Sequence, residues 1–152
     1  MESILKDGYR LYRNKGGKAL GVAEHSRVKI IERDGLCFKD FTGEGELLPY
    51  ADWRLDPGER AEDLAGRLSI EEIAGLMLYS SHQMVPADNS FSGTYQGKEF
   101  KEGETKPWEL TDQQKQFIEK DGVRHVLVTR LADTETAVKW NNRLQALAEN
   151  TG

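Results

Sequence analysis

Oxygen-bearing side chains in the segment Asp40–Trp53 follow the spacing of a calcium-binding loop. Such a loop takes oxygen ligands at positions one, three, five and seven, needs glycine at six, and closes with a carboxylate at twelve. Positions one, three and five are Asp40, Thr42 and Glu44. Position six is Gly45, but positions nine and twelve are Leu48 and Ala51, and Asp52 is the only substitute carboxylate nearby. We therefore expect the turn to persist without a cofactor, with bound calcium as the less favoured alternative.

Polar residues that follow two predicted strands form a second candidate site. Short apolar runs predict strands at Leu76–Ser80 and Val123–Thr129. Ser81 and His82 follow the first strand, and Arg130 follows the second. Active sites of α/β barrels lie at the carboxyl ends of the strands. The sequence therefore predicts substrate contacts at this edge, although a structural hydrogen bond is the favoured role for His82.

A long polar connection, Ser81–Leu110, carries several aromatic residues. Connections of this length in compact domains are usually functional or disordered. The aromatic residues are Phe91, Tyr95, Phe100 and Trp108. Aromatic rings offer flat apolar faces against which a ligand can pack, so Trp108 is a candidate substrate contact. Anchoring of the loop by these rings is the alternative that we favour.

No other residue pattern indicates a catalytic centre. The histidines His25, His82 and His125 lack the spacing of metal ligands, and Cys37 is the only cysteine. The sequence contains no glycine-rich phosphate-binding motif and no G-x-S-x-G nucleophile motif. We therefore assign no catalytic residue within this chain.

Two helix starts stand close together in the middle of the chain. Asp56, Pro57 and Glu59 combine a capping oxygen, a proline in the first turn and an early carboxylate. Ser69 and Glu72 form a capping box, in which each side chain accepts a hydrogen bond from an otherwise unpaired amide. Both patterns predict helices that begin immediately after the cap.

The second half of the chain is predicted to alternate strand and helix. Helices are expected at Asp112–Lys120, after Thr111 as the cap, and at Thr134–Glu149. The resulting β-α-β-α order indicates parallel strands. The apolar stripe of the second helix, Trp140, Leu144 and Leu147, is expected to need neighbours from outside this segment.

The first half is predicted to be less regular. Residues Met1–Gly21 indicate an irregular arm or a short helix, and Asp34-Gly35 predicts a hairpin between Arg27–Ile31 and Leu36–Phe38. We predict two regions: residues 1–55, an arm with the hairpin and the calcium-like loop, and residues 56–152, the alternating region.

Several motifs occur in a characteristic order. W-R-L-x-P, E-R-A-x-D-L and L-S-I-E-E-x-A-G-L-M fall between Asp52 and Met77. R-H-V-L-V-T-R (Arg124–Arg130) and T-A-V-K-W-N-N-R-L-Q (Thr136–Gln145) follow. From Asp34 to Gly152 the chain resembles the N-terminal approach to the barrel of glycoside hydrolase family 3, the family of β-glucosidases and related exo-glycosidases.

This resemblance implies a fold and a reaction. The fold would be α/β, the opening β-α-β-α units of a (β/α)8 TIM-type barrel. The function would be that of the N-terminal part of a retaining, exo-acting β-glycosidase that hydrolyses O-glycosidic bonds in a small β-glucoside or oligosaccharide. The family's catalytic carboxylates lie further along than Gly152, so we expect the segment alone to be inactive. A periplasmic or secreted location is implied, although the sequence shows no signal peptide.

Charge and hydropathy limit the partners. The chain has 152 residues and a formal net charge of -5. Nucleic acid is not expected as a partner because phosphate binding needs clustered basic residues, and no run approaches the roughly 20 apolar residues of a membrane span. The expected partner is the remainder of the barrel enzyme, with a homodimer left open. The alternative function is a stand-alone, non-catalytic module that binds carbohydrate or protein.

Overall fold

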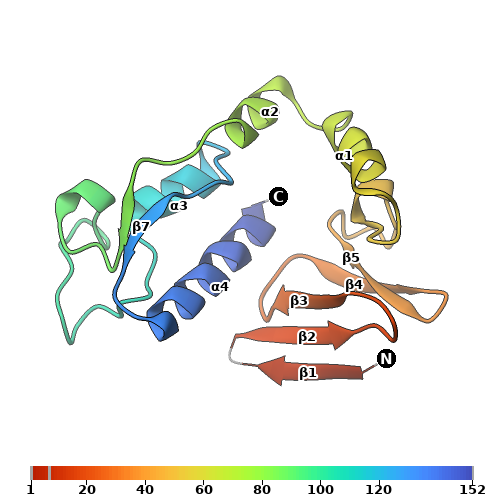
Figure 1. Ribbon diagram of the computed structural model, residues 1–152, viewed down its shortest axis with the longest axis horizontal. Helices are drawn as coiled ribbons and strands as arrows, with labels where there is room; N and C mark the ends of the chain where they lie inside the picture. The colour runs from red at the N-terminus through yellow and green to blue at the C-terminus, as the bar shows by residue number, and fades with distance from the viewer. Residues whose placement is uncertain (1, 7, 152) are drawn as a thin grey trace. The chain divides into compact units, whose positions relative to one another are not determined.

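The computed structural model describes residues 2–6 and 8–151. It divides into two compact units, with the division between Leu68 and Ser69. Figure 1 shows the elements of each unit. In the described part, three small sheets and four α-helices make a mixed α/β fold. By its contacts helix α1 (Pro57–Ala65) groups with the N-terminal unit, and the domain boundary between residues 55 and 56 stays a prediction.

The N-terminal unit begins with a three-stranded antiparallel sheet, ordered β1 (Glu2–Lys6), β2 (Tyr9–Arg13) and β3 (Ala19–Ala23). The prediction of an irregular arm or short helix here was therefore wrong. Strand β2 contains two tyrosines, a residue type that is common in strands. Gly16, at φ 71°, occupies the connection to β3 in a backbone conformation that glycine adopts readily.

A hairpin of β4 (Lys29–Arg33) and β5 (Leu36–Asp40) follows, as predicted. Asp34 and Gly35 both have positive φ, 53° and 73°, as a two-residue turn of the primed type requires. The turn pairs Arg33 with Leu36 and so places Lys29 opposite Asp40.

Phe38 lies at the centre of the packing in this unit. Its side chain is fully buried and stacks on Trp53 with 5.2 Å between ring centroids. The Trp53 indole N–H donates to the Cys37 carbonyl at 2.9 Å, and Arg54 lies over the Phe38 ring. A short 3-10 helix, η1 (Pro49–Ala51), and α1 complete the unit. Asp56 caps α1 as predicted.

The C-terminal unit alternates strands and helices, as predicted. In chain order it contains α2 (Ile70–Leu76), β6 (Gln83–Val85), the 3-10 helix η2 (Ser90–Ser92), α3 (Asp112–Glu119), β7 (Val128–Leu131) and α4 (Thr134–Thr151). Strands β6 and β7 pair in parallel, and α3 lies between them in the chain (Figure 1). Capping boxes at Ser69 and Thr111 start α2 and α3.

The core of this unit joins β6, α3 and α4. Its buried members are Val85, Leu110, Ile118, Trp140 and Leu144, with Leu147 partly buried against them. The indole N–H of Trp140 donates to Gln114 Oε1 at 3.0 Å. The expectation that the Trp140 stripe needs neighbours from outside was therefore wrong, because α3 and β6 already cover it.

Both predicted strands of this unit were displaced. Residues Leu76–Ser80 are not a strand: α2 runs to Leu76, and the paired strand is β6. Likewise β7 begins at Val128 rather than Val123. Before β6 and β7 begin, an isolated bridge pairs Tyr79 with His125. The Leu127 amide then donates to the Ser80 hydroxyl instead of to a backbone carbonyl of a regular ladder.

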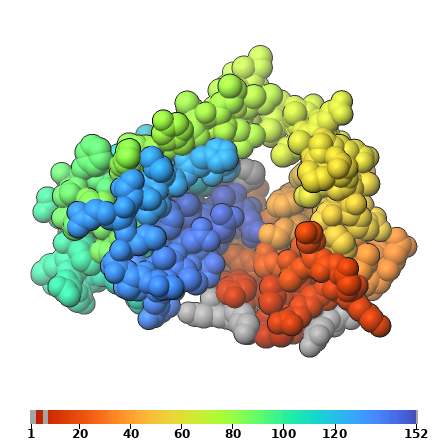
Figure 2. Space-filling model, viewed as in Figure 1, coloured from red at the N-terminus to blue at the C-terminus, as the bar shows by residue number. Residues whose placement is uncertain are grey.

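The end of α2 leaves apolar side chains at the surface. Ile70, Met77 and Tyr79 are 82%, 80% and 73% exposed. We call residues 70–79 the apolar strip; in the space-filling view they belong to the yellow-green part of the chain (Figure 2). Among the described residues, no helix is both long and apolar enough to cross a membrane.

Candidate functional site

The calcium-like loop is closed around a buried carboxylate. Asp40 is 1% exposed, and its Oδ1 accepts from the amides of Thr42 and Gly43 at 3.0 and 2.9 Å. Its Oδ2 accepts from the Gly45 amide at 2.9 Å, and the Thr42 hydroxyl donates to Oδ1 at 2.8 Å. The loop thus turns its N–H donors toward Asp40.

Basic side chains from β4 donate hydrogen bonds to carbonyl oxygens of the same loop. Lys29 Nζ donates to the Gly43 carbonyl at 3.3 Å, and Arg33 Nη2 donates to the Gly45 carbonyl at 2.6 Å. The Glu44 side chain is exposed. In the part of the chain that the structure describes, no three His, Cys, Asp or Glu side chains are grouped to hold a metal. The structure brings Asp40 and Thr42 together through a hydrogen bond and leaves the Glu44 side chain exposed. A calcium site formed by Asp40, Thr42 and Glu44 stays a prediction.

Hydrogen bonds determine the charge states of the carboxylates near this loop. Burial alone would raise the pKa of Asp40, but the donors from Gly45, Thr42 and Gly43 outweigh it and hold the pKa below its usual value. Asp52, the substitute ligand, instead pairs with Arg54 through bonds of 2.9 and 2.6 Å. That bonding to Arg54 also lowers the pKa of Asp52.

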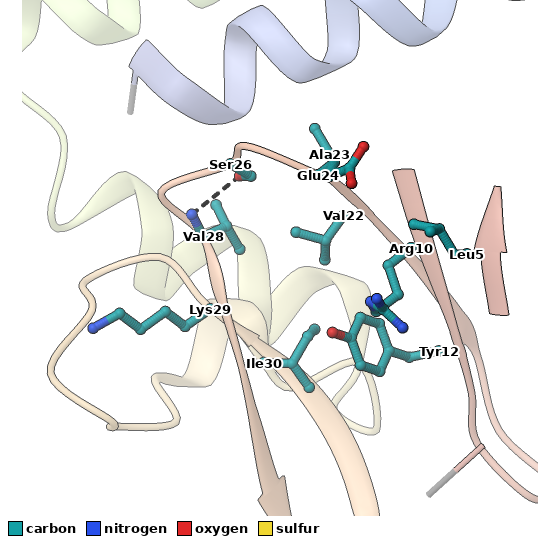
Figure 3. A pocket seen from close by; sticks show the side chains of 10 residues that line it. All are labelled: Leu5, Arg10, Tyr12, Val22, Ala23, Glu24, Ser26, Val28, Lys29 and Ile30. Atoms are coloured by element: carbon teal, nitrogen blue, oxygen red, sulfur yellow. Dashed lines mark hydrogen bonds between the residues drawn. The ribbon is translucent and has the colours of Figure 1, made fainter. Parts of the chain in front are cut away.

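A cavity of about 410 Å³ lies in the N-terminal unit (Figure 3). Val22 and Val28 form its buried wall. Two of the surrounding polar side chains make hydrogen bonds within the unit. The Ser26 hydroxyl accepts from the Val28 amide, and Lys29 extends away from the cavity and donates to the Gly43 carbonyl. We assign no ligand to this cavity.

Ser81 and His82 lie before β6 rather than after a strand. Ser81 is fixed by Gln83, whose side-chain amide donates to the Ser81 hydroxyl at 3.1 Å and to its carbonyl at 3.2 Å. Both residues therefore lie at the amino end of the parallel pair. The structure does not bring them to the edge that Arg130 occupies, because the strand begins at Gln83.

The carboxyl edge of the pair is built from residues after β6 and at the end of β7. The Ala132 amide donates to the Val85 carbonyl at 3.0 Å, which holds the two strand ends together. Arg130 Nη2 lies 3.5 Å from Asp88 Oδ2, with both side chains largely exposed. This edge therefore offers a guanidinium and a carboxylate to the surroundings.

Most aromatic rings of the long connection anchor it. Lys139 Nζ lies 4.0 Å from the centre of the Trp108 ring, which packs against the core. Tyr95 is buried, its hydroxyl accepts from the Ala87 amide at 2.9 Å, and Phe100 lies against its ring. Phe91 differs, since it is 66% exposed.

A comparison with curated proteins shows what the chain is similar to. Over 124 residues it is 34% identical to a periplasmic beta-glucosidase/beta-xylosidase of Dickeya chrysanthemi. The chain is similar to one segment of a β-glucosidase. The match covers 80% of this chain and 17% of that relative, so the chain spans a small part of the relative's length. It confirms the resemblance to a family-3 type β-glucosidase that the motifs indicated. No protein-family model matches the chain.

Sequence reasoning missed one functional candidate of this β-glucosidase-like segment, Asp88, and did not distinguish a second, Phe91, from the neighbouring aromatic residues. Asp88 follows β6 by three residues, and it could have been found only by ending the strand at Val85. The signal was Pro86, which cannot donate to a ladder and so favours a strand end. Phe91 was among the aromatic residues considered, but the sequence did not show that it alone stays exposed.

Proposed function

We propose that this chain forms the N-terminal part of the catalytic barrel of a retaining, exo-acting β-glucosidase-type glycoside hydrolase. The observation that carries the proposal is the 34% identity over 80% of the chain. The parallel pair of β6 and β7, with α3 between them and α4 after them, supports it. Such β-α-β-α units are the repeating elements of a (β/α)8 barrel.

The proposed reaction needs two carboxyl groups about 5 to 5.5 Å apart, one as nucleophile and one as acid and base. The acid must carry a raised pKa to be protonated near neutral pH. Among the described Asp and Glu side chains with a resolved shift, every pKa is lowered. Hydrogen bonds from the backbone amides of Gly45 and Gly97 account for the lowered pKa values of Asp40 and Asp112. None of these groups has the raised pKa of an acid catalyst, and we propose, as the family resemblance implies, that both catalytic carboxylates lie outside this chain.

The apolar strip supports an incomplete barrel. Parallel strands are found covered on both faces, and large exposed apolar patches mark interaction sites. In this unit α3 and α4 pack on one side of the strands, whereas Met77, Leu78 and Tyr79 remain largely exposed. We propose that the remainder of the barrel covers this strip.

The name of the Dickeya chrysanthemi relative supports a location and a substrate class. We propose that the enzyme acts in the periplasm or outside the cell, on small β-glucosides or β-xylosides, as that name suggests.

A second candidate is a stand-alone module that binds carbohydrate or protein. The observation that favours this candidate is that the C-terminal unit has a buried core of its own. In the described residues no buried side-chain nitrogen or oxygen lacks a hydrogen-bond partner.

Turnover of an aryl β-glucoside separates the two candidates. The purified chain alone should release no aryl alcohol above the buffer background, because neither carboxylate is present. A chimera in which this chain replaces the aligned segment of the Dickeya chrysanthemi relative should be active, whereas the relative without that segment should be inactive. Turnover by the chain alone would show that the placement of the catalytic carboxylates is wrong.

A further inference from the structure

We propose that Phe91, Asp88 and Arg130 form a contact site for a neutral β-pyranoside at the carboxyl edge of β6 and β7. The site would determine substrate preference in the enzyme proposed above, and in that respect it rests on the proposed function. The direct binding of a sugar to these residues does not depend on it.

A chain of contacts joins the side chains of Arg130 and Asp88 to the backbone of Phe91. Arg130 Nη2 lies 3.5 Å from Asp88 Oδ2, and the Asn89 side-chain amide donates to Asp88 Oδ1 at 3.2 Å. Asn89 Oδ1 in turn accepts from the Phe91 amide at 3.0 Å. The short run 88–91 is therefore fixed against the end of β7.

The edge is held by the fold rather than by a free loop. The Ser92 hydroxyl is fully buried and accepts from the Met84 amide of β6 at 3.1 Å. Asn89 caps η2, the turn that carries Phe91. Phe91 is thus presented outward from a fixed backbone, and its ring stays two-thirds exposed.

The paired charges favour a neutral polyol over an anion. A lone guanidinium suits phosphate or carboxylate, which it binds through parallel hydrogen bonds. Here Asp88 neutralises Arg130 and offers acceptors beside its donors. Vicinal sugar hydroxyls both donate and accept, so they match this pair. The side chains are 71% and 51% exposed, which leaves both open to a ligand.

Phe91 supplies the apolar half of the contact. A β-glucopyranoside or β-xylopyranoside carries its hydroxyls equatorially, so each face of its ring is a C–H surface. Such a face can pack on an aromatic ring and remove apolar area from water. Phe91 lies three residues after Asp88 on the fixed run 88–91, and its exposed ring would supply the surface for this face of the ligand.

Substitutions at this site should leave the fold intact. Exposed ion pairs contribute little to stability, and Phe91 buries little of its ring. Loss of binding in Arg130→Gln, Asp88→Asn or Phe91→Ala can therefore be separated from unfolding. Matched controls exist: Arg143→Gln removes another 3.5 Å pair, with Glu109, and Phe41→Ala removes another exposed phenyl ring.

Saturation-transfer NMR on the 152-residue chain, with methyl β-D-glucopyranoside and methyl β-D-xylopyranoside as probes, tests the site. We expect saturable transfer to the ring protons, with the dissociation constant raised at least about fivefold by each site variant and changed less than about twofold by each control. Inorganic phosphate should not compete. The proposal would be overturned if no saturable transfer were seen or if phosphate competed. It would also be overturned if Arg130→Gln and Phe91→Ala bound the probes as tightly as the parent chain does.

The active chimera gives a second measurement. There Arg130→Gln and Phe91→Ala should raise KM for an aryl β-glucoside, while Arg143→Gln should not. If the chimera were active and its KM were unchanged by both site variants, the contact site would be refuted and the proposed function would stand. If the chain bound the sugar probes but the chimera were inactive, the contact site would be supported and the proposed function refuted.

Discussion

At the scale of single residues, Asp40 carries the largest number of hydrogen bonds in its loop. Asp40→Asn keeps one acceptor oxygen but turns an NH2 group toward N–H donors such as that of Gly45. Leaving buried donors unpaired costs about 1–3 kcal/mol each, so we expect the free energy of unfolding to fall by about that amount in urea titrations. Glu44→Gln, in the same loop but exposed, should stay within about 0.5 kcal/mol. Equal stability of the two variants would contradict this role for Asp40.

Asp40 also makes stability depend on pH. Its folded pKa is lowered, so the stability it contributes is complete above the unfolded value of about 3.9 and is lost as pH falls through the folded pKa. Thermal melts of the parent chain should therefore drop on the acid side of about pH 4, and Asp40→Asn should show a shallower drop. Identical acid limbs would show that another carboxylate dominates.

The same loop should be indifferent to calcium. Lys29 and Arg33 already donate to the Gly43 and Gly45 carbonyls, and positions nine and twelve lack oxygen ligands. Millimolar calcium should leave the melting temperature of the parent chain unchanged, whereas Leu48→Asp combined with Ala51→Glu should give a response. A shift in the parent chain that a chelator removes would disprove this.

At the scale of elements, Gly75 sets how closely α2 approaches the turn before residue 123. A Cβ there would stand 2.6 Å from the Gly122 carbonyl oxygen. Alanine in a helix normally gains up to about 1 kcal/mol over glycine, but overpacking costs about 1–3 kcal/mol. Gly75→Ala should therefore lower the urea midpoint. Gly66→Ala, where a Cβ meets only ordinary contacts, should not lower it; equal effects would rule out the close packing.

Local signals in the sequence predicted elements better than they predicted partners. The capping patterns at Asp56 and Ser69 and the Asp34-Gly35 turn depend on a few neighbouring residues, and the structure has them all. The run after Gly75 was misread because a short apolar run does not distinguish a helix end from a strand. The β1–β3 sheet depends on pairing between residues that are apart in the sequence, and the composition of β2 does not reveal this pairing.

In the candidate site, too, features set by neighbouring residues were predicted better than features set by strand pairing. Arg130 was predicted at the carboxyl edge because it ends a run of apolar residues, and β7 ends one residue later, at Leu131. Asp88 was missed and Ser81 and His82 were placed at the wrong end, because both depend on where β6 begins and ends. Trp108 was singled out by type alone, and its packing under Lys139 could not be seen from the sequence.

At the scale of the whole molecule, the chain has a parallel strand pair with one side covered and an exposed apolar strip. A segment of a larger barrel accounts for both, since neighbouring units would cover the strip and extend the sheet. In the chimera with the Dickeya chrysanthemi relative, residues 70–79 should then show slower amide hydrogen exchange than in the chain alone. Equal exchange in a folded chimera would mean that the strip is not covered.

The most direct measurement is kcat/KM of that chimera on an aryl β-glucoside. The account predicts a value within about tenfold of the relative's own, or about 1.4 kcal/mol of transition-state stabilisation. Gly75→Val in the chimera should reduce the amount of active enzyme, which checks that the grafted segment is in use. A chimera that is soluble and folded by circular dichroism yet releases no aryl alcohol would contradict the assignment of this chain to a β-glucosidase barrel.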